Sequence, residues 1–264
     1  MNLSKASPDE VISYGPHSQQ FGHLYLPKVQ NSSPLALVVL IHGGCWRNRV
    51  NLDYFGQAAR ALTALGVAVW SIEYRRLDDG GGWPNTFSDV ALAADKVNEL
   101  AQSYALDLTR VMAMGHSAGG HLAHWLAART KLNPGQELYR AAPLRLKGFI
   151  SIAGIPDLAE AIKKNICQEA PLALMGALKS ELPERYTQGS PADMGSLSLK
   201  QVFIQGIQDS IVPLTYIEAY VDARRLAGDI IDLIKIDQCG HFEPVIATTR
   251  AWQEVEKALI AVLS

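Results

Sequence analysis

A serine set between glycines is the feature of this sequence with the clearest chemical meaning. The heptapeptide Gly-His-Ser-Ala-Gly-Gly-His occupies residues 115–121, between a short apolar run and a helical pattern. Glycines two residues before and after Ser117 are typical of a nucleophile elbow, a tight strand-to-helix turn that lifts the serine hydroxyl above a sheet. Gly115 and Gly119 leave room where a Cβ would push neighbouring segments apart. The alternative is a glycine-rich helix start whose serine is only an N-cap.

A serine hydroxyl becomes a strong nucleophile only when a base takes its proton, and a third group must orient that base. Asp209 lies in the stretch GIQDSIVP and His241 in the stretch CGHF, each shortly after an apolar run. The order serine, acid, histidine, with each residue at a strand end, is the one expected after a nucleophile elbow. Singly, Asp209 could cap a helix and His241 could occupy a surface turn. Asp237 is a rival acid, disfavoured because it precedes His241 by only four residues. We predict the triad Ser117, Asp209 and His241.

Acyl transfer also requires hydrogen-bond donors for the oxyanion that develops on the substrate. The pentapeptide His-Gly-Gly-Cys-Trp at 42–46 follows an apolar run and can present backbone amides at close range. We assign the amides of Gly44 and Cys45 as donors, together with the amide of Ala118 beside the serine. The choice among Gly43, Gly44 and Cys45 is open by one residue. Cys45 could also be a reactive thiol, but it has no evident base partner.

The remaining histidines near these motifs are expected to have structural roles. His121 and His124 lie one helical turn apart, a spacing that a metal ion can use. No third ligand is apparent, so we expect packing or hydrogen bonding, with no metal and no cofactor. His116 is expected to shape the surroundings of the elbow, and His42 to brace the oxyanion loop through side-chain hydrogen bonds.

The surroundings of the substrate are predicted from the neighbours of these motifs. Trp46 and Phe242 adjoin predicted catalytic positions and are candidates for substrate contact. Residues 155–195 contain helical fragments at 158–164 and 172–178, several turn signals and no convincing strand. An insertion of this kind after a strand lies where binding sites form, at the carboxyl ends of a parallel sheet. We expect a small cap, and its shortness and charged residues favour small soluble substrates over long acyl chains.

Apolar runs alternate with amphipathic helical patterns along the chain. The alternation predicts βαβ units and hence the α/β class, with a mostly parallel central sheet and helices on both faces. Two short β-prone runs predict an antiparallel pair at the start. We expect one domain over residues 1–264. The expected strands are 11–14, 21–26, 35–41, 67–72, 110–114, 148–153, 201–205 and 230–236, and the expected helices are 53–65, 87–104, 117–129, 212–226 and 245–263.

Composition narrows the class of protein. A net charge of −2, with 48% hydrophobic and 19% charged residues, gives no reason to expect nucleic acid or an anionic membrane as partner. No apolar run approaches the roughly 20 residues that span a bilayer, and the first residues lack the apolar core of a signal peptide. The cysteines, Cys45, Cys167 and Cys239, are too few and too scattered for a disulfide framework or a zinc site. These features predict a soluble cytoplasmic protein, and they allow a homodimer.

Together the motifs resemble the α/β-hydrolase superfamily over nearly the whole chain. The branch with small bacterial esterases and kynurenine formamidase (arylformamidase) is similar in three places: Tyr-Gly at 14–15 with Leu-Tyr-Leu-Pro at 24–27, HGG-x-W at 42–46, and GHSAGGHL at 115–122. Cys45 departs from the branch, because many hormone-sensitive-lipase-type esterases have a third glycine there and the formamidases usually have tyrosine. The resemblance implies Ser117 as nucleophile, Asp209 as orienting acid, His241 as base, and oxyanion donors from Gly44, Cys45 and Ala118.

The expected activity is therefore cofactor-free hydrolysis of small carboxylic esters through an acyl-enzyme. Hydrolysis of an N-formyl or aryl amide, as in arylformamidase with N-formylkynurenine, is the close alternative. A non-catalytic binding module on the same fold is a remote alternative, because such proteins usually lose a triad member and this chain keeps all three candidates.

Overall fold

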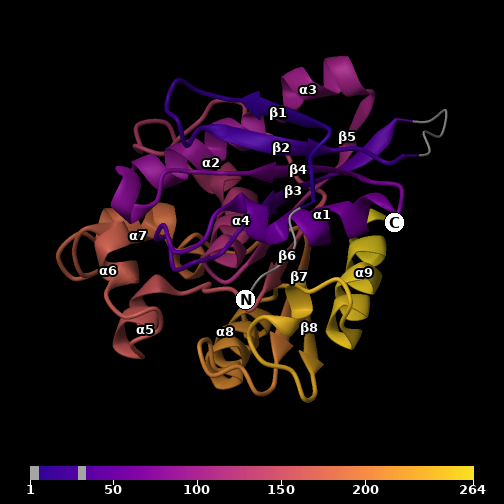
Figure 1. Cartoon of the computed structure of the whole chain (residues 1–264). Helices are drawn as coiled ribbons and strands as arrows, with labels where there is room; N and C mark the ends of the chain where they lie inside the picture. The colour runs from indigo at the N-terminus through magenta and orange to yellow at the C-terminus, as the bar shows by residue number, and fades with distance from the viewer. Residues whose placement is uncertain (1–5, 29–33) are drawn as a thin grey trace.

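A single mixed sheet runs through the molecule. The computed structural model describes residues 6–28 and 34–264, and within them eight strands form one sheet in the order β1-β2-β4-β3-β5-β6-β7-β8 (Figure 1). β2 is antiparallel to both of its neighbours, and all pairings from β4 to β8 are parallel. The strands are β1 (Glu10–Ser13), β2 (Phe21–Tyr25), β3 (Leu35–Ile41), β4 (Ala68–Ile72), β5 (Leu106–His116), β6 (Gly148–Ile152), β7 (Lys200–Gly206) and β8 (Ile231–Ile236).

Helices cover both faces of the sheet, which explains why the central strands are apolar throughout. Every residue of β3 is buried, and alternate side chains enter two different cores. α1 (Gly56–Thr63) and α9 (Arg250–Leu263) pack on one face, with Val38 and Leu40. The other face, with Leu37 and Val39, is covered by α2 (Asn85–Asp95), α3 (Val97–Tyr104), α4 (Ala118–Ala128) and α8 (Leu214–Leu226).

Residues 155–195 leave the alternation and form short helices. These are α5 (Leu158–Lys163), α6 (Ala170–Met175) and α7 (Pro183–Gly189), which lie together at the left of Figure 1. No strand occurs between β6 and β7 in this described segment. α7 is bonded to α4, because the His121 ring contacts the Gly189 carbonyl at 2.8 Å and the Trp125 indole N–H donates to the Gln188 carbonyl at 2.7 Å. The insertion is therefore attached directly to the helix that follows Ser117.

The predicted α/β class, the antiparallel start and the order of strands and helices are confirmed. The predicted helix 87–104 divides at Lys96 into α2 and α3, and α7 was not predicted. The last helix begins at Arg250 rather than 245, because the Thr249 side chain caps it by accepting from the Trp252 amide. The predicted loop 27–34 and the amino-terminal segment lie partly outside the described residues.

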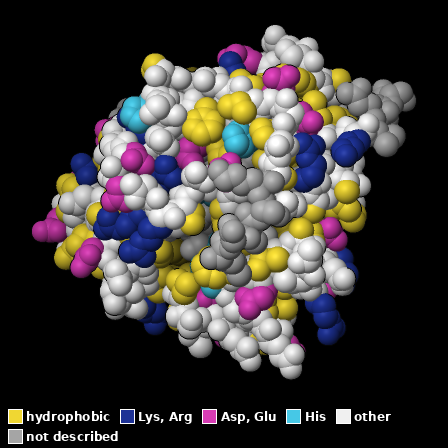
Figure 2. Space-filling model, in the orientation of Figure 1, with side chains coloured by type: hydrophobic (Ala, Val, Ile, Leu, Met, Phe, Trp, Pro, Cys, Tyr) yellow, Lys and Arg dark blue, Asp and Glu magenta, His cyan; other side chains and the backbone are white. Residues whose placement is uncertain are grey.

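On the face of the molecule that Figure 2 shows, neither sign of charge dominates. Figure 2 shows acidic and basic side chains interspersed over one face of the molecule, in keeping with the small net charge of −2. None of the helices in the described ranges is long and apolar enough to cross a bilayer.

Candidate active site

Ser117 occupies the sharp turn between β5 and α4. Its backbone has φ 54° and ψ −119°, a conformation that costs of order 1–3 kcal/mol for a non-glycine residue and persists only where the surroundings enforce it. The Ser117 amide donates to the Ile152 carbonyl of the adjacent strand end at 2.8 Å. A Cβ at position 119 would lie 2.0 Å from the Ile41 carbonyl oxygen, and one at position 115 would lie 2.0 Å from that of Gly119. The predicted reason for both glycines is confirmed.

Replacing Gly119 by alanine is expected to destabilise the fold by about 3 kcal/mol or more, because the overlap is with backbone and no rotamer change relieves it. Gly66→Ala is the matched control. Gly66 has φ +83° and open space around it, so alanine there costs only about 1 kcal/mol through its backbone preference. Denaturant unfolding of both variants measures the difference, and equal losses would contradict the steric account of the elbow.

Asp209 and His241 are brought together at the carboxyl ends of neighbouring strands. The His241 Nδ1 lies 2.7 Å from Asp209 Oδ2, and both residues are buried. Asp209 Oδ2 also accepts from the Gln205 amide side chain at 2.9 Å, while Oδ1 accepts from the Ile211 and Val212 amides at 2.8 and 2.9 Å. Burial alone would raise the pKa of Asp209, but the hydrogen bond and charge of His241 and the two amides outweigh it and lower this pKa.

The Asp209 carboxylate fixes the tautomer of His241. A carboxylate only accepts, so Nδ1 carries the proton that points at Asp209 and the other ring nitrogen is left to accept. His241 and Ser117 line one cavity of about 170 Å³. Within the described residues no hydrogen bond joins the Ser117 hydroxyl to another group. This looseness is common in ligand-free sites, where catalytic hydrogen bonds tighten only once substrate is bound.

His116 is hydrogen-bonded to the loop that carries His241. Its Nε2 lies 2.8 Å from the His241 carbonyl oxygen, which only accepts, so Nε2 carries a proton. Burial, and the repulsion that would arise between two protonated rings at His116 and His241, lower the pKa of His116 to about 3. The His116 ring is therefore neutral, and its Nδ1 accepts the Tyr54 hydroxyl at 2.8 Å. The predicted role of His116 in shaping the elbow surroundings is confirmed, and Tyr54 is a partner that the sequence did not indicate.

The loop after β3 brings free backbone amides to the same cavity. Gly44 and Cys45 line it together with Ser117. In the described part of the chain the amides of Gly44, Cys45 and Ala118 donate to no acceptor. Gly43 packs closely against His116 and Ser117. A Cβ at position 43 would lie 3.1 Å from the Cβ of Ser117 and 2.8 Å from the His116 carbonyl oxygen. Gly44 and Cys45 line the cavity and Gly43 does not, and the choice of Gly44 and Cys45 as donors stays a prediction.

A buried histidine–carboxylate pair braces this loop. His42 is fully buried, with Nε2 2.8 Å from Glu73 Oε1 and Nδ1 2.9 Å from the Gly43 carbonyl oxygen. Its ring stacks on Tyr74 with centroids 4.5 Å apart. Burial opposes ionisation of Glu73, but the charge and hydrogen bond of His42 outweigh it and lower the pKa of this carboxyl. The bracing role predicted for His42 is confirmed. Glu73 was missed, although an acidic residue directly after the buried strand β4 was a usable signal.

The walls of the cavity are mainly apolar. Phe242 contributes from the loop of His241, with its ring edge-on to that histidine at 5.0 Å between centroids. The expectation that Trp46 contacts substrate is wrong. Trp46 is fully buried and packs edge-on against His121 instead of lining the cavity, because the left-handed turn at residues 44–46 directs it into the core. Wall residues that the sequence did not indicate are Arg49, Val50, Tyr54 and Ile211.

Comparison with known proteins decides the family. The profile of the BD-FAE family matches residues 23–221, which is most of the chain. The chain belongs to the BD-FAE family. It is also 25% identical over 248 residues to a probable isoprenylcysteine alpha-carbonyl methylesterase of Oryza sativa subsp. japonica, an alignment that covers 87% of this chain. The chain spans 56% of the length of that relative.

Solved esterase structures share the fold. A truncated carbohydrate esterase from gut microbiota superposes with a TM-score of 0.79 at 21% identity, covering 98% of this chain and 96% of that one. A propionate-bound thermophilic esterase of Thermogutta terrifontis gives 0.77 at 18% identity, covering 96% and 93%. The predicted α/β-hydrolase fold and the resemblance to α/β-hydrolase esterases are confirmed. The resemblance to arylformamidase stays a prediction.

Two cysteines of this BD-FAE member are paired, although their scattered positions in the sequence predicted no disulfide framework. Cys45 and Cys167 form a disulfide with their Cα atoms 5.6 Å apart, although 122 positions separate them in sequence. The topology explains the pairing, because the loops that follow β3 and β6 emerge at the same edge of the sheet. Cys45 is therefore not a free thiol. Disulfides are rare in reducing compartments, so the cysteine argument for the cytoplasm no longer holds.

The other histidines are committed to packing and hydrogen bonds. His121 is bonded to Gly189 as described above, and His124 stacks on Phe149 with ring centroids 4.4 Å apart. Burial lowers the pKa of His121 to about 4 and that of His124 well below its ordinary value. Across residues 6–28 and 34–264 no group of three or more potential ligands is arranged to hold a metal ion.

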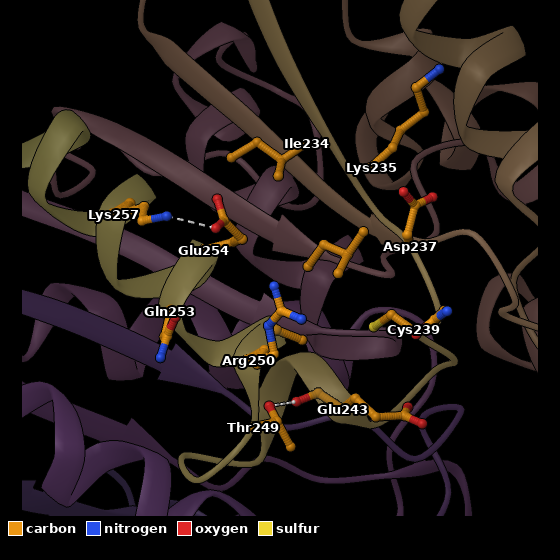
Figure 3. Close-up of a pocket in the computed structure, with 13 residues that line it drawn as sticks. Ile234, Lys235, Asp237, Cys239, Glu243, Thr249, Arg250, Gln253, Glu254 and Lys257 are labelled. Carbon is orange, nitrogen blue, oxygen red and sulfur yellow. Dashed lines mark hydrogen bonds and ion pairs between the residues drawn. The ribbon is translucent and has the colours of Figure 1, made fainter.

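Asp237, the rival acid, lies in a separate groove. This groove is about 730 Å³ in volume and runs between β8 and the start of α9 (Figure 3). Asp237 shares it with Arg250 and Glu254 and makes no hydrogen bond to His241 within the described structure. Cys239 also lines it, and burial together with Glu243 raises the pKa of that thiol to about 11. The groove is larger than the cavity at Ser117, but its thiol contacts the Gly240 carbonyl oxygen at 3.5 Å and has no hydrogen bond to a basic side chain in the described structure.

Proposed function

We propose that this protein is a serine hydrolase that cleaves small carboxylic esters through an acyl-enzyme intermediate. The observation that carries the proposal is the convergence of Ser117, on a strained elbow, and His241, hydrogen-bonded to Asp209 at 2.7 Å, on one cavity. Acyl transfer needs these three roles in this geometry. Membership of the BD-FAE family and the esterase names of the similar structures support the same reaction class.

In the first half of the reaction Ser117 attacks the ester carbonyl while His241 accepts the hydroxyl proton at Nε2. Asp209 keeps the proton on Nδ1 and stabilises the imidazolium that forms. The oxyanion of the tetrahedral intermediate accepts hydrogen bonds from the amides of Gly44, Cys45 and Ala118, which have no other acceptor in the described chain. Collapse of the intermediate expels the alcohol, which takes the proton from His241.

Water completes the cycle by the same path. His241 removes a proton from water, which attacks the acyl-Ser117 carbonyl, and the amides again hold the oxyanion. Breakdown of the second intermediate releases the acid and returns the proton to the serine. The triad and the backbone amides supply every step, so we propose no cofactor and no metal.

We further propose that the chain is one domain and that residues 155–195 act as a small cap. The segment reaches the cavity wall through the bond between Cys167 and Cys45, and it is fixed to α4 through Gly189 and Gln188. Phe242 and Ile211 also line the cavity, and we expect them to contact the substrate.

A short acyl group is expected to be preferred. The cavity of about 170 Å³ lies below the roughly 300–1,000 Å³ of pockets for drug-sized ligands. Specificity constants for p-nitrophenyl acetate and propionate are expected to exceed that for the octanoate by about 10- to 100-fold, the range that a hydrophobic pocket of fixed size can impose. A specificity constant that rises with acyl chain length would contradict a small acyl pocket.

The same assay separates the competing reactions when N-formylkynurenine and an aminoacyl anilide are added to the ester series. A specificity constant for N-formylkynurenine far above that for every ester would move the assignment to arylformamidase. Hydrolysis of none of the substrates, together with no reaction with a fluorophosphonate, would favour a non-catalytic binding module.

A further inference from the structure

The Cys45–Cys167 disulfide joins the wall of the active site to the insertion. Cys45 follows β3 and lines the cavity with Ser117, whereas Cys167 lies between α5 and α6. The predicted oxyanion donor and the cap-like segment are therefore linked covalently, within the site itself. The esterase mechanism above makes no use of this bond.

The backbone at Cys45 is held in an unfavourable conformation. Gly44, Cys45 and Trp46 have φ values of 107°, 53° and 54°, three consecutive residues in the left-handed region. A non-glycine residue keeps such a conformation only where its surroundings enforce it. Gly44 is held because its carbonyl accepts from the Arg47 amide at 3.0 Å. Trp46 is held by burial and because its carbonyl accepts from the Leu77 amide at 2.8 Å.

The backbone of Cys45 itself is not fixed by hydrogen bonds to any residue that the structure describes. Neither its N–H nor its carbonyl takes part in a hydrogen bond within the described residues. Its one specific attachment is the bond from its sulfur to Cys167. Cys45, the proposed oxyanion donor, is thus attached to the described residues through its side chain and not through its backbone.

The other end of the tether is firmly seated. The turn that carries Cys167 is closed by bonds from the Ile166 amide to the Ala161 carbonyl at 2.9 Å and from the Ala170 amide to the Cys167 carbonyl at 3.2 Å. The start of α5 is fixed to α8, because the Tyr216 hydroxyl accepts from the Asp157 amide at 3.0 Å and donates to its carbonyl at 2.7 Å. Cys167 and Gln168 also have left-handed φ values, of 59° and 56°, but these backbone bonds close the turn around them, whereas the backbone of Cys45 has none among the described residues.

We propose that the Cys45–Cys167 disulfide positions the Cys45 amide in the oxyanion hole, so that ester turnover depends on the thiol–disulfide state of this pair. The inference rests on the proposed esterase function. A thiolate of a dithiol reductant attacks one sulfur of the pair, which releases the other cysteine as a thiol and leaves a mixed disulfide. The second thiol of the reductant then attacks the reductant's own sulfur in that mixed disulfide and releases the remaining cysteine. The protein gains two thiols, and the reductant becomes a cyclic disulfide. Reduced Cys45 is free to leave the left-handed conformation and to carry its amide away from the oxyanion.

The test compares oxidised and reduced enzyme after the reductant has been removed under argon. Loss of one oxyanion donor typically costs about 10²–10³-fold in kcat, so reduction is expected to lower kcat by about 10²-fold with little change in KM. Reoxidation is expected to restore the rate. Alkylation and mass measurement count the thiols in each sample, and far-UV circular dichroism at the assay temperature verifies that the reduced protein is folded. Cys239→Ala, which removes the free thiol, is expected to keep the same ratio of oxidised to reduced rates.

A pair of variants shows whether the disulfide positions the Cys45 amide or only stabilises the fold. Cys45→Gly and Cys45→Ala both lack the disulfide, but glycine adopts φ near +53° without penalty and alanine does not. Cys45→Gly is expected to keep about 10-fold more kcat than Cys45→Ala. Cys167→Ser is expected to have the same kcat as reduced wild type, and its kcat is expected not to change when the reductant is added.

Equal kcat in oxidised and reduced wild type, with the thiol count showing that the bond was broken, would overturn the inference and leave the esterase proposal standing. So would equal kcat in the two Cys45 variants, or three free thiols in fully active untreated enzyme. Absence of ester hydrolysis in both redox states would instead overturn the proposed function and the inference with it.

Discussion

Replacing Ser117 by alanine is expected to lower kcat/KM for ester hydrolysis by at least about 10⁴-fold, because no covalent acyl-enzyme can form without the hydroxyl. The side chain makes no hydrogen bond within the described residues, so the fold loses no contact on which it depends. Alanine also removes a polar atom from a strained turn, and the unfolding midpoint is expected to stay the same or to rise. The residual rate comes from the oxyanion amides and from substrate binding alone.

The assay for this variant is steady-state hydrolysis of p-nitrophenyl acetate, with circular dichroism to verify the fold. Ser103→Ala, an exposed serine replacement on α3, is the matched control and is expected to behave as wild type. Activity of Ser117→Ala within tenfold of wild type would end the assignment of Ser117 as nucleophile.

Asp209→Asn is expected to lower kcat by about 10³–10⁴-fold, close to the loss seen when the acid of a triad becomes an amide. The two carboxylate oxygens accept four hydrogen bonds, from His241 and Gln205 on one oxygen and from two backbone amides on the other. An asparagine has one acceptor oxygen, so its NH₂ must face donors whichever way it turns. Turned toward His241, it forces the proton from Nδ1 to Nε2, and the histidine can no longer accept the serine proton.

The matched control for this variant is Asp237→Asn, the same chemical change at the rival acid. Asp237 lies in the groove of Figure 3, away from His241, so a change in kcat of less than about twofold is expected. The measurement is kcat for both variants on one ester. A larger loss in Asp237→Asn than in Asp209→Asn would show that the wrong acid was assigned.

The hydrophobic pattern of the sequence predicted the strands and helices whose positions depend on neighbouring residues alone. The continuous apolar run of β3 was predicted to the residue, because a strand covered on both faces must be apolar at every position. Boundaries failed where a cap or a long-range pairing decides them. β5 extends back to Leu106 because that residue pairs with Leu35 of β3. α9 begins only at Arg250 because the Thr249 side chain caps the helix there.

The site was predictable to the extent that its residues belong to strand-end motifs. Ser117, Asp209 and His241 each follow a strand of a parallel sheet, and the topology brings such positions to one edge. Three features of the site depend on loop conformation and on contacts between distant segments. They are the direction of the Trp46 side chain, the hydrogen bond between Glu73 and His42, and the Cys45–Cys167 bond. Sequence spacing carries no information on those contacts, and for the cysteines it led to the wrong expectation.

The central claim is that Ser117 is the residue that becomes acylated, and covalent labelling tests it most directly. Wild-type protein is treated with an active-site fluorophosphonate, and the adduct is located by intact mass and by peptide mapping. We predict one adduct per chain, on the peptide that contains Ser117, and none in Ser117→Ala under the same conditions. Ester hydrolysis by a protein that is labelled at another residue, or never labelled at Ser117, would contradict it.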